Sequence, residues 1–95
     1  MIKVKVTVVL DLVDLLNRRN MDFQVKEGTT VRELLEIMIS RYGPRLEEKV
    51  YADKKKGVLN LNLYLNGRHI HFLSGLDTVM QDKDTLLLIP FAAGG

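Results

Sequence analysis

Residues 29–44, TTVRELLEIMISRYGP, carry the clearest helix signal in the chain and decide its fold class. Thr30 and Glu33 have the spacing of a capping box, in which each side chain bonds the backbone N–H of the other residue. Gly43 stands where a left-handed cap ends a helix, and Pro44 cannot continue one. Between these signals, six side chains fall on one helical stripe: Val31, Leu34, Leu35, Met38, Ile39 and Tyr42.

This stripe needs an apolar surface to pack on. Burying six such side chains contributes about 9 to 18 kcal/mol, at about 1.5 to 3 kcal/mol each. Ordering a dozen helical residues costs a similar amount, at about 1 to 2 kcal/mol each. Because the helix can only offset its own ordering, it must lie on a sheet, and the sequence predicts a two-layer α+β domain.

Two segments before the helix alternate apolar and polar residues, which is the pattern of a half-buried strand. Their connection, residues 11–20, has leucines at helical spacing but ends in a polar cluster, which fits either a turn of helix or a loop. Two strands joined this closely predict a hairpin. The apolar positions are Ile2, Val4, Val6 and Val8 in the first strand and Met21, Phe23 and Val25 in the second.

The half of the chain after the helix begins with a charged segment. Residues 45–58 show no period, so we expect an irregular surface excursion there. Residues 61–65 then alternate, with leucines on one face. Asn66-Gly67 follows and predicts a type I′ hairpin turn, because both central positions of that turn need positive φ.

The segment that returns from this turn also alternates. Residues 73–84 are rich in turn formers, and residues 85–91 form the predicted last strand. In the returning segment, the expected inward pair is Ile70 with Phe72, and the expected outward pair is His69 with His71.

Composition limits the classes of function. The 95 residues suffice for one domain, and 46% hydrophobic with 27% charged residues is a globular composition. A net charge of +2 is too small for a nucleic-acid footprint, and the absence of cysteine excludes disulfides and thiolate sites. With no signal peptide and no long apolar run, we expect a cytoplasmic protein with neither a nucleic-acid nor a membrane partner.

Enzyme signals are weak. His69 and His71 have a spacing that could seat a metal, but no third ligand accompanies them. Asp82 and Asp84 flank Lys83 in a turn, where side-chain hydrogen bonds to the backbone are their expected role. Phosphate-binding glycine loops and the HExxH and GxSxG patterns are missing. We therefore expect no enzyme activity of its own, no metal and no bound cofactor.

The chain ends in residues with almost nothing to bury. Ala92 and Ala93 offer one methyl group each, and Gly94 and Gly95 offer none. Fixing each residue costs about 1 to 2 kcal/mol of backbone entropy. We therefore expect a mobile tail of residues 92–95 on a domain of residues 1–91, with an ordinary frayed terminus as the alternative.

Residues 62–95, NLYLNGRHIHFLSGLDTVMQDKDTLLLIPFAAGG, resemble the C-terminal third of the MoaD/ThiS sulfur-carrier superfamily. The likeness is greatest to archaeal MoaD-type small modifier proteins and to the bacterial carrier used for cysteine synthesis. MIKVKV and EGTTVRELLEIM extend it over most of the chain. It implies a ubiquitin-like β-grasp roll, a mixed sheet with one main helix on one face and the first and last strands adjacent in the middle. Where the family commonly has Gly-Asp in the last turn, this chain has Lys83-Asp84.

The resemblance also implies a chemistry for the C-terminus. A separate ubiquitin-activating-type enzyme would use ATP to adenylate the carboxylate of Gly95, while Gly94, Ala93 and Ala92 thread into its cleft. Sulfur transfer would then give a thiocarboxylate, which donates sulfur to an accepting enzyme in cofactor, cysteine or tRNA thiolation pathways. In modifier relatives the same acyl group joins target-protein lysines, and in the molybdopterin branch the carrier is the small subunit of molybdopterin synthase. A β-grasp interaction module with an idle tail is the alternative from a different class.

Strand parity predicts where the activating enzyme docks. If the apolar residues of the strands pack beneath the helix, the alternate residues lie on the open face of the sheet. Too many of these residues are apolar for a surface that has no binding partner. The alternative is that residues 45–58 cover Leu87 or Ile89. The predicted docking residues are Thr7, His69, Leu87, Ile89 and Phe91, with Val9 and His71 on the same face.

Overall fold

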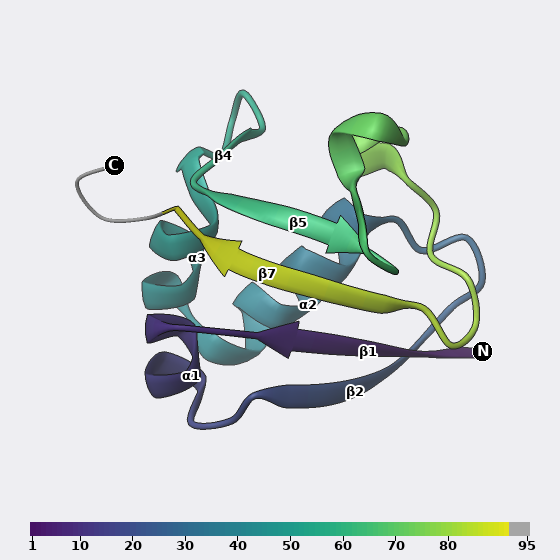
Figure 1. The fold of residues 1–95 in the computed structure, drawn as a ribbon, viewed down its shortest axis with the longest axis horizontal. Coiled ribbons are helices and arrows are strands. Elements are labelled where there is room, and N and C mark those ends of the chain that lie inside the picture. Colours follow the sequence, from purple (N-terminus) through teal and green to yellow (C-terminus); the bar gives the residue numbers. More distant parts are fainter. Residues whose placement is uncertain (92–95) are drawn as a thin grey trace.

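The computed structural model describes residues 1–91; the predicted tail of residues 92–95 lies outside the described residues. Figure 1 shows one mixed sheet with helices behind it. The five strands of this sheet have the order β2-β1-β7-β5-β6. They are β1 (Ile2–Val8), β2 (Asn20–Val25), β5 (Leu61–Leu65), β6 (Arg68–His69) and β7 (Thr85–Pro90).

The first and last strands lie side by side in the middle of the sheet, as predicted. β1 and β7 are parallel, with Val6 opposite Leu86 and Val8 opposite Leu88. All four of these side chains are buried. β2 pairs antiparallel with β1, which confirms the predicted hairpin, and β5 pairs antiparallel with β7. The last strand is therefore paired with β1 as far as Leu88 and with β5 as far as Pro90.

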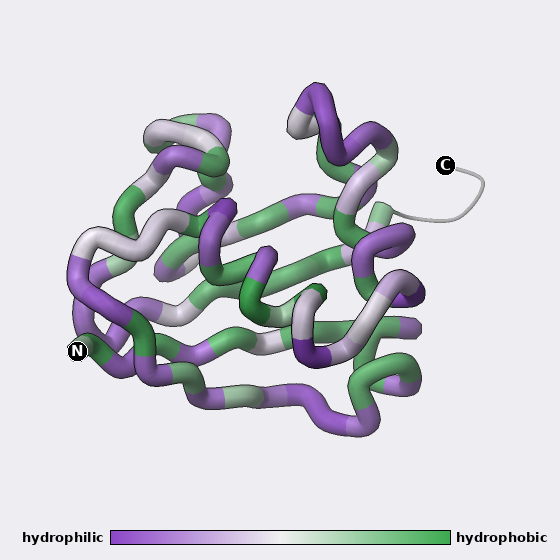
Figure 2. The backbone as a smooth tube through the Cα atoms, turned by 180° about the vertical axis from the view of Figure 1, so that it is seen from behind, coloured by the Kyte–Doolittle hydropathy of each residue, from purple (hydrophilic) through white to green (hydrophobic). Residues whose placement is uncertain are grey.

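Helix α2 (Val31–Tyr42) begins and lies as the sequence predicts. Thr30 and Glu33 form the capping box, with the Glu33 N–H donating to Thr30 Oγ1 at 3.2 Å. Five of the six stripe residues are buried against the sheet, and Tyr42 is half-buried. Seen from behind, the helices cover one face of the sheet (Figure 2). The two-layer α+β prediction is confirmed.

The connection between β1 and β2 contains helix α1 (Asp11–Leu16), so the helical alternative for residues 11–20 is the correct one. Leu12 and Leu16 are buried in the core. None of the helices among residues 1–91 is long and apolar enough to cross a membrane.

Residues 45–58 are not the irregular excursion that we expected. They contain most of helix α3 (Pro44–Val50) and the small hairpin of β3 (Tyr51–Asp53) and β4 (Val58–Leu59). Pro44 ends α2 but also starts α3, because its fixed φ suits the first position of a helix. Leu46 and Val50 then fall one turn apart and are fully buried.

Gly43 joins the two helices in a conformation that differs from the predicted cap. Its φ of 88° is positive, but its ψ of −171° is extended, so the left-handed helical cap is wrong. The Gly43 N–H still donates to Ile39 O at 2.7 Å, and Gly43 O accepts from Leu46 N at 3.1 Å. One residue thus serves the end of α2 and the start of α3.

The hairpin at Asn66-Gly67 is confirmed, with φ values of 52° and 85°. The returning strand, however, stops at His69, and a 3-10 helix, η1 (Ile70–Phe72), follows. Ile70 is buried as predicted, but Phe72 is 77% exposed, so its predicted inward position is wrong. The cause is the His69 imidazole, which accepts the His71 N–H at 3.0 Å and bends the chain out of the sheet.

The last turn confirms the expected roles of the two aspartates. Asp82 Oδ1 accepts the Lys3 N–H at 2.8 Å, and Asp84 Oδ2 accepts the Gln81 N–H at 2.7 Å. Asp84 Oδ1 also accepts from Asn66 Nδ2 at 2.8 Å. These bonds tie the start of β7 to β1 and to the β5–β6 turn.

Lys83 adopts φ 72° between these aspartates, in the left-handed region that favours glycine. Replacing Lys83 with Gly should stabilise the protein by about 0.5 to 1 kcal/mol, since relief of strain exceeds the added chain entropy. Chemical denaturation measures this difference. Lys83→Ala, which keeps a Cβ at the same φ, is the matched control and should gain nothing. A loss of stability in Lys83→Gly would contradict the strain argument.

Candidate functional site

The candidate site begins at the C-terminal end of β7. Leu61 pairs with Pro90 at the last register position of β7, and Phe91 is the last described residue. Phe91 is 51% exposed although it is a large apolar side chain. The predicted acyl carrier Gly95 and the predicted threading residues Gly94, Ala93 and Ala92 lie outside the described residues.

The open face of the sheet lies beside this end. Leu87 is centred in a row across three strands, with Thr7 of β1 on one side and Tyr64 of β5 on the other. Ile89 lies opposite Asn62 in the next row toward the chain end. All five of these side chains are half-buried, and they alternate with fully buried core residues.

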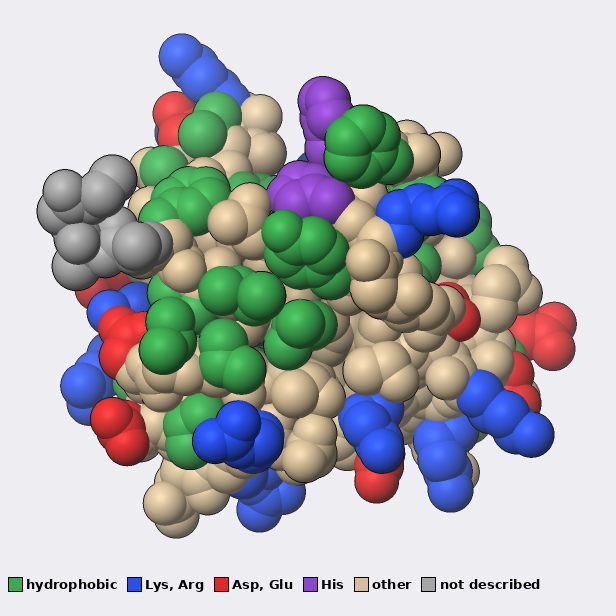
Figure 3. Space-filling view, in the orientation of Figure 1, with side chains coloured by type: hydrophobic (Ala, Val, Ile, Leu, Met, Phe, Trp, Pro, Cys, Tyr) green, Lys and Arg blue, Asp and Glu red, His purple; other side chains and the backbone are tan. Residues whose placement is uncertain are grey.

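Apolar side chains gather on this face. Figure 3 shows them as one green patch beside the histidines. Helix α3 contacts α1 and α2, and it lies behind the sheet in Figure 1 while the β3–β4 hairpin stands beyond the β5 edge. Residues 45–58 therefore lie on the helix side and at the edge. The face that holds Leu87 and Ile89 is left open, and its role in docking stays a prediction.

His69 extends the row beyond Tyr64. Its Nδ1 accepts the His71 N–H, so the ring proton is on Nε2, which donates to Asn62 Oδ1 at 3.1 Å. The ring meets Tyr64 edge-on at 5.1 Å between centroids. These three contacts fix His69 on the open face. His71 is exposed, and among residues 1–91 no group of three metal-ligating side chains of His, Cys, Asp or Glu is assembled.

The opposite end of the row is polar. Thr7 Oγ1 donates to Asn20 Oδ1 at 2.8 Å, and Lys5 lies one row away from Thr7 on the same face. The face thus has an apolar centre on β7 with hydrogen-bonding groups on both sides. Such a surface suits a protein partner better than a small substrate.

Sequence reasoning omitted two members of this face. Tyr64 and Asn62 were not among the predicted docking residues, yet they flank Leu87 and Ile89 in the register. The signal was available, because both alternate with the buried leucines of β5.

Comparison with known proteins identifies the family. The model of the ThiS family matches residues 6–95. The chain belongs to the ThiS family. Proteins of this family and its MoaD-type relatives are small sulfur carriers or ubiquitin-like modifiers, not catalysts themselves.

Individual relatives of this ThiS-family chain agree. A protein of Archaeoglobus fulgidus named "Putative sulfur carrier protein" is 30% identical over 71 residues, which are 73% of this chain and 77% of that protein. The crystal structure of SAMP1 from Haloferax volcanii is 25% identical with a TM-score of 0.78, covering 98% of this chain and 99% of that chain.

A third likeness is to a chain in a complex of two proteins. The structure of the Amycolatopsis orientalis BexX/CysO complex contains a chain 29% identical to this ThiS-family protein, with a TM-score of 0.71. The match covers 97% of this chain and 99% of that chain. Together these structures confirm the predicted ubiquitin-like β-grasp fold and the MoaD/ThiS resemblance.

Proposed function

We propose that this protein carries sulfur as a thiocarboxylate on Gly95. A ubiquitin-activating-type enzyme joins the Gly95 carboxylate to the AMP of ATP and releases pyrophosphate. A sulfur donor then displaces AMP from the acyl adenylate. The resulting thiocarboxylate gives its sulfur to an accepting enzyme in a cofactor, cysteine or tRNA thiolation pathway.

The single observation that carries this proposal is the extent of the family match. The ThiS-family model runs through residue 95, so it includes β7, Pro90 and the terminal Gly94-Gly95. The name of the Archaeoglobus fulgidus relative supports the same function.

The physical chemistry agrees with a carrier that is acted on by another protein. A carboxylate is a poor electrophile, so it must be held in line with a nucleotide phosphate to form a mixed anhydride. Side chains as small as those of residues 92–95 allow the backbone to approach a catalytic centre closely. Because β7 is paired with β1 as far as Leu88 and with β5 as far as Pro90, the strand that leads to these residues is held in the sheet.

The open face supplies the docking surface in this proposal. Ordering four tail residues on a partner costs about 4 to 8 kcal/mol of backbone entropy, at about 1 to 2 kcal/mol each. Contacts elsewhere must offset that cost. Leu87, Ile89 and Phe91 offer apolar area next to the chain end, and Thr7 and His69 flank it with polar groups.

Incubating the full chain with ATP, sulfide and its activating enzyme tests the proposal. Intact-mass spectrometry should show a gain equal to the mass difference between sulfur and oxygen, and it should depend on ATP. An unchanged mass with the cognate enzyme would contradict the carrier function and favour a β-grasp module with an idle tail.

A second candidate is a protein modifier, favoured by the likeness to SAMP1 of Haloferax volcanii. The same acyl adenylate would then react with lysine amines of target proteins. Digested cell proteins should carry branched Gly-Gly remnants on lysines that vanish when the gene is deleted. If no such remnants form while the thiocarboxylate does, sulfur transfer is the sole use of Gly95.

A further inference from the structure

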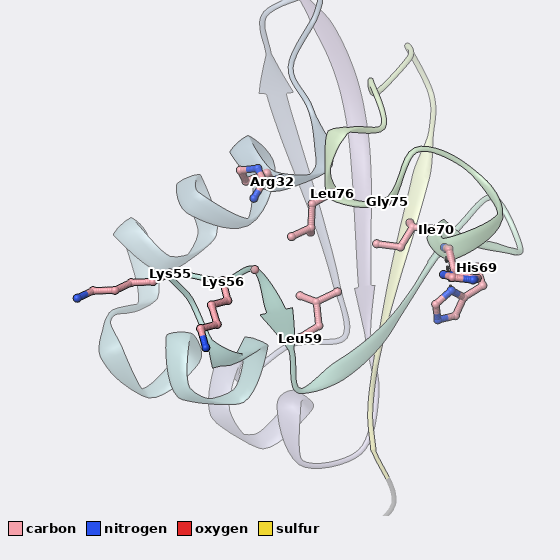
Figure 4. Close-up of a pocket in the computed structure, with 10 residues that line it drawn as sticks. Arg32, Lys55, Lys56, Leu59, His69, Ile70, Gly75 and Leu76 are labelled. Carbon is pink, nitrogen blue, oxygen red and sulfur yellow. Dashed lines mark hydrogen bonds between the residues drawn. The ribbon is translucent and has the colours of Figure 1, made fainter.

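A notch lies at the β5–β6 edge of the sheet, next to the open face. Its volume is about 390 Å³. Figure 4 shows Leu59 of β4, Ile70 of η1 and Leu76 of the second 3-10 helix, η2 (Gly75–Asp77), gathered at its centre from three separate segments. Ile70 and Leu76 are buried at 3% and 9% exposure, so the floor of the notch is the edge of the core.

The rim of the notch is cationic. Arg32, Lys55 and Lys56 line it together with the apolar floor. Arg32 Nη2 lies 3.0 Å from Asp77 Oδ1, and this hydrogen bond raises the pKa of the guanidinium. Within residues 1–91, neither Lys55 nor Lys56 has a carboxylate oxygen within 4.0 Å of its ammonium group.

The three consecutive lysines differ in whether a carboxylate neutralises their charge, and Lys54 is the one that is neutralised. Its Nζ lies 2.8 Å from Glu47 Oε1 and 3.2 Å from Glu36 Oε2, so its charge is compensated. Lys55 and Lys56, which follow it, have no carboxylate partner among the described residues, so their charge is not compensated. The notch therefore combines an apolar floor with two lysines, Lys55 and Lys56, whose charge is not compensated, whereas Arg32 is paired with Asp77.

The notch is continuous with the open face through His69. This residue lines the notch and also contacts Tyr64, which neighbours Leu87 on the open face. A partner seated on the open face can therefore reach the notch by passing over one side chain.

We propose that the notch takes one apolar side chain, flanked by carboxylates, from an extended segment of the enzyme that activates Gly95. The apolar side chain packs on Leu59, Ile70 and Leu76, and the carboxylates face Lys55 and Lys56 of the rim. This inference rests on the proposed function, since it adds a second contact to the same complex.

The geometry favours such a segment over a small anion such as phosphate. Figure 4 shows that Lys55 extends away from the apolar centre and that Arg32 and Lys56 come from different segments and do not converge on one point. Cations spread in this way suit several carboxylates along a chain, whereas a phosphate needs donors that converge on one point. The apolar floor also offers a phosphate no hydrogen-bond donor.

Charge reversal of the rim tests the proposal in the activation reaction. The Lys55→Glu/Lys56→Glu variant should raise the KM of the activating enzyme for this protein about tenfold at low salt, with kcat unchanged and a smaller effect at high salt. The matched control is Lys26→Glu/Lys83→Glu, which changes the net charge equally at exposed sites that do not line the notch. A KM equal to that of the control would overturn the inference, whereas an inactive wild type would contradict the proposed function itself.

A peptide titration tests the notch without the enzyme. The probe is the acetylated, amidated peptide GDELDEG, followed by NMR of the isotope-labelled protein. Amide shifts should centre on residues 55–59, 69–71 and 75–77, and should be lost with GDESDEG, with GNQLNQG and in Lys55→Glu/Lys56→Glu. Inorganic phosphate is the second probe. Equal responses to phosphate and peptide, or no response of these residues to GDELDEG, would overturn the inference.

Discussion

Deletion of Gly95 should abolish adenylation of the chain while changing its free energy of unfolding by no more than about 0.5 kcal/mol. One residue of extended chain spans about 3.3 to 3.6 Å. The shortened chain would therefore hold its carboxylate back by a distance as large as the roughly 3 to 3.5 Å that separates reacting atoms in a productive complex. ATP-dependent pyrophosphate release and thermal unfolding measure the two effects.

Two substitutions separate the length of the tail from its shape. Gly94→Val keeps the length but adds a branched side chain next to the reacting group, and it should also lose activation. Ala92→Ser, which keeps a small side chain farther from the carboxylate, should remain active. Activation of the deletion variant at the wild-type rate would refute Gly95 as the acyl carrier, and a loss of several kcal/mol of stability would show that the residue is packed.

Most of the fold could be predicted because its strands are half-buried and its main helix is amphipathic. In β1, β2 and β5 every second residue is buried, so the period in the sequence corresponds directly to the two faces of the sheet. The same parity placed Thr7, Leu87 and Ile89 on the open face. The capping box and the Asn66-Gly67 turn were predictable because each needs particular residues at fixed positions.

Two elements were mispredicted, and in each case the reason is a residue that can have either of two structural roles. Pro44 ends a helix by lacking an N–H, yet the same property makes it a good first residue, and only the burial of Leu46 and Val50 reveals α3. His69 fits the alternation of a strand, but its ring accepts the His71 N–H and turns the chain into η1. Local bonds of this kind compete with the sheet and leave no trace in hydrophobic periodicity.

The cationic notch could not be predicted at all. Its floor joins Leu59, Ile70 and Leu76, which the sequence separates and only the β3–β4 hairpin and the two 3-10 helices bring together. The lysine run itself was visible, but which of its members lack a carboxylate partner depends on where Glu36 and Glu47 lie. Charge compensation is a property of the folded arrangement, not of the local sequence.

Replacement of Phe91 with Ala should raise the KM for activation by about 30-fold to 1,000-fold, since central aromatic contacts at interfaces contribute about 2 to 4 kcal/mol. Phe91 is 51% exposed and follows directly on β7, so the loss should fall on the complex and not on folding. Steady-state kinetics with the activating enzyme measures the change, and Leu87→Ser should act in the same direction.

The ratio of the two kinetic constants decides what Phe91 does. A docking contact is present before and during the reaction, so its removal raises KM and leaves kcat within about twofold. A residue that guided the tail into the catalytic centre would lower kcat instead. Ile37→Ala is the matched control, because Ile37 is 38% exposed on α2, the helix that covers the other face of the sheet. An equal rise in KM for Ile37→Ala would mean that the enzyme does not select the open face.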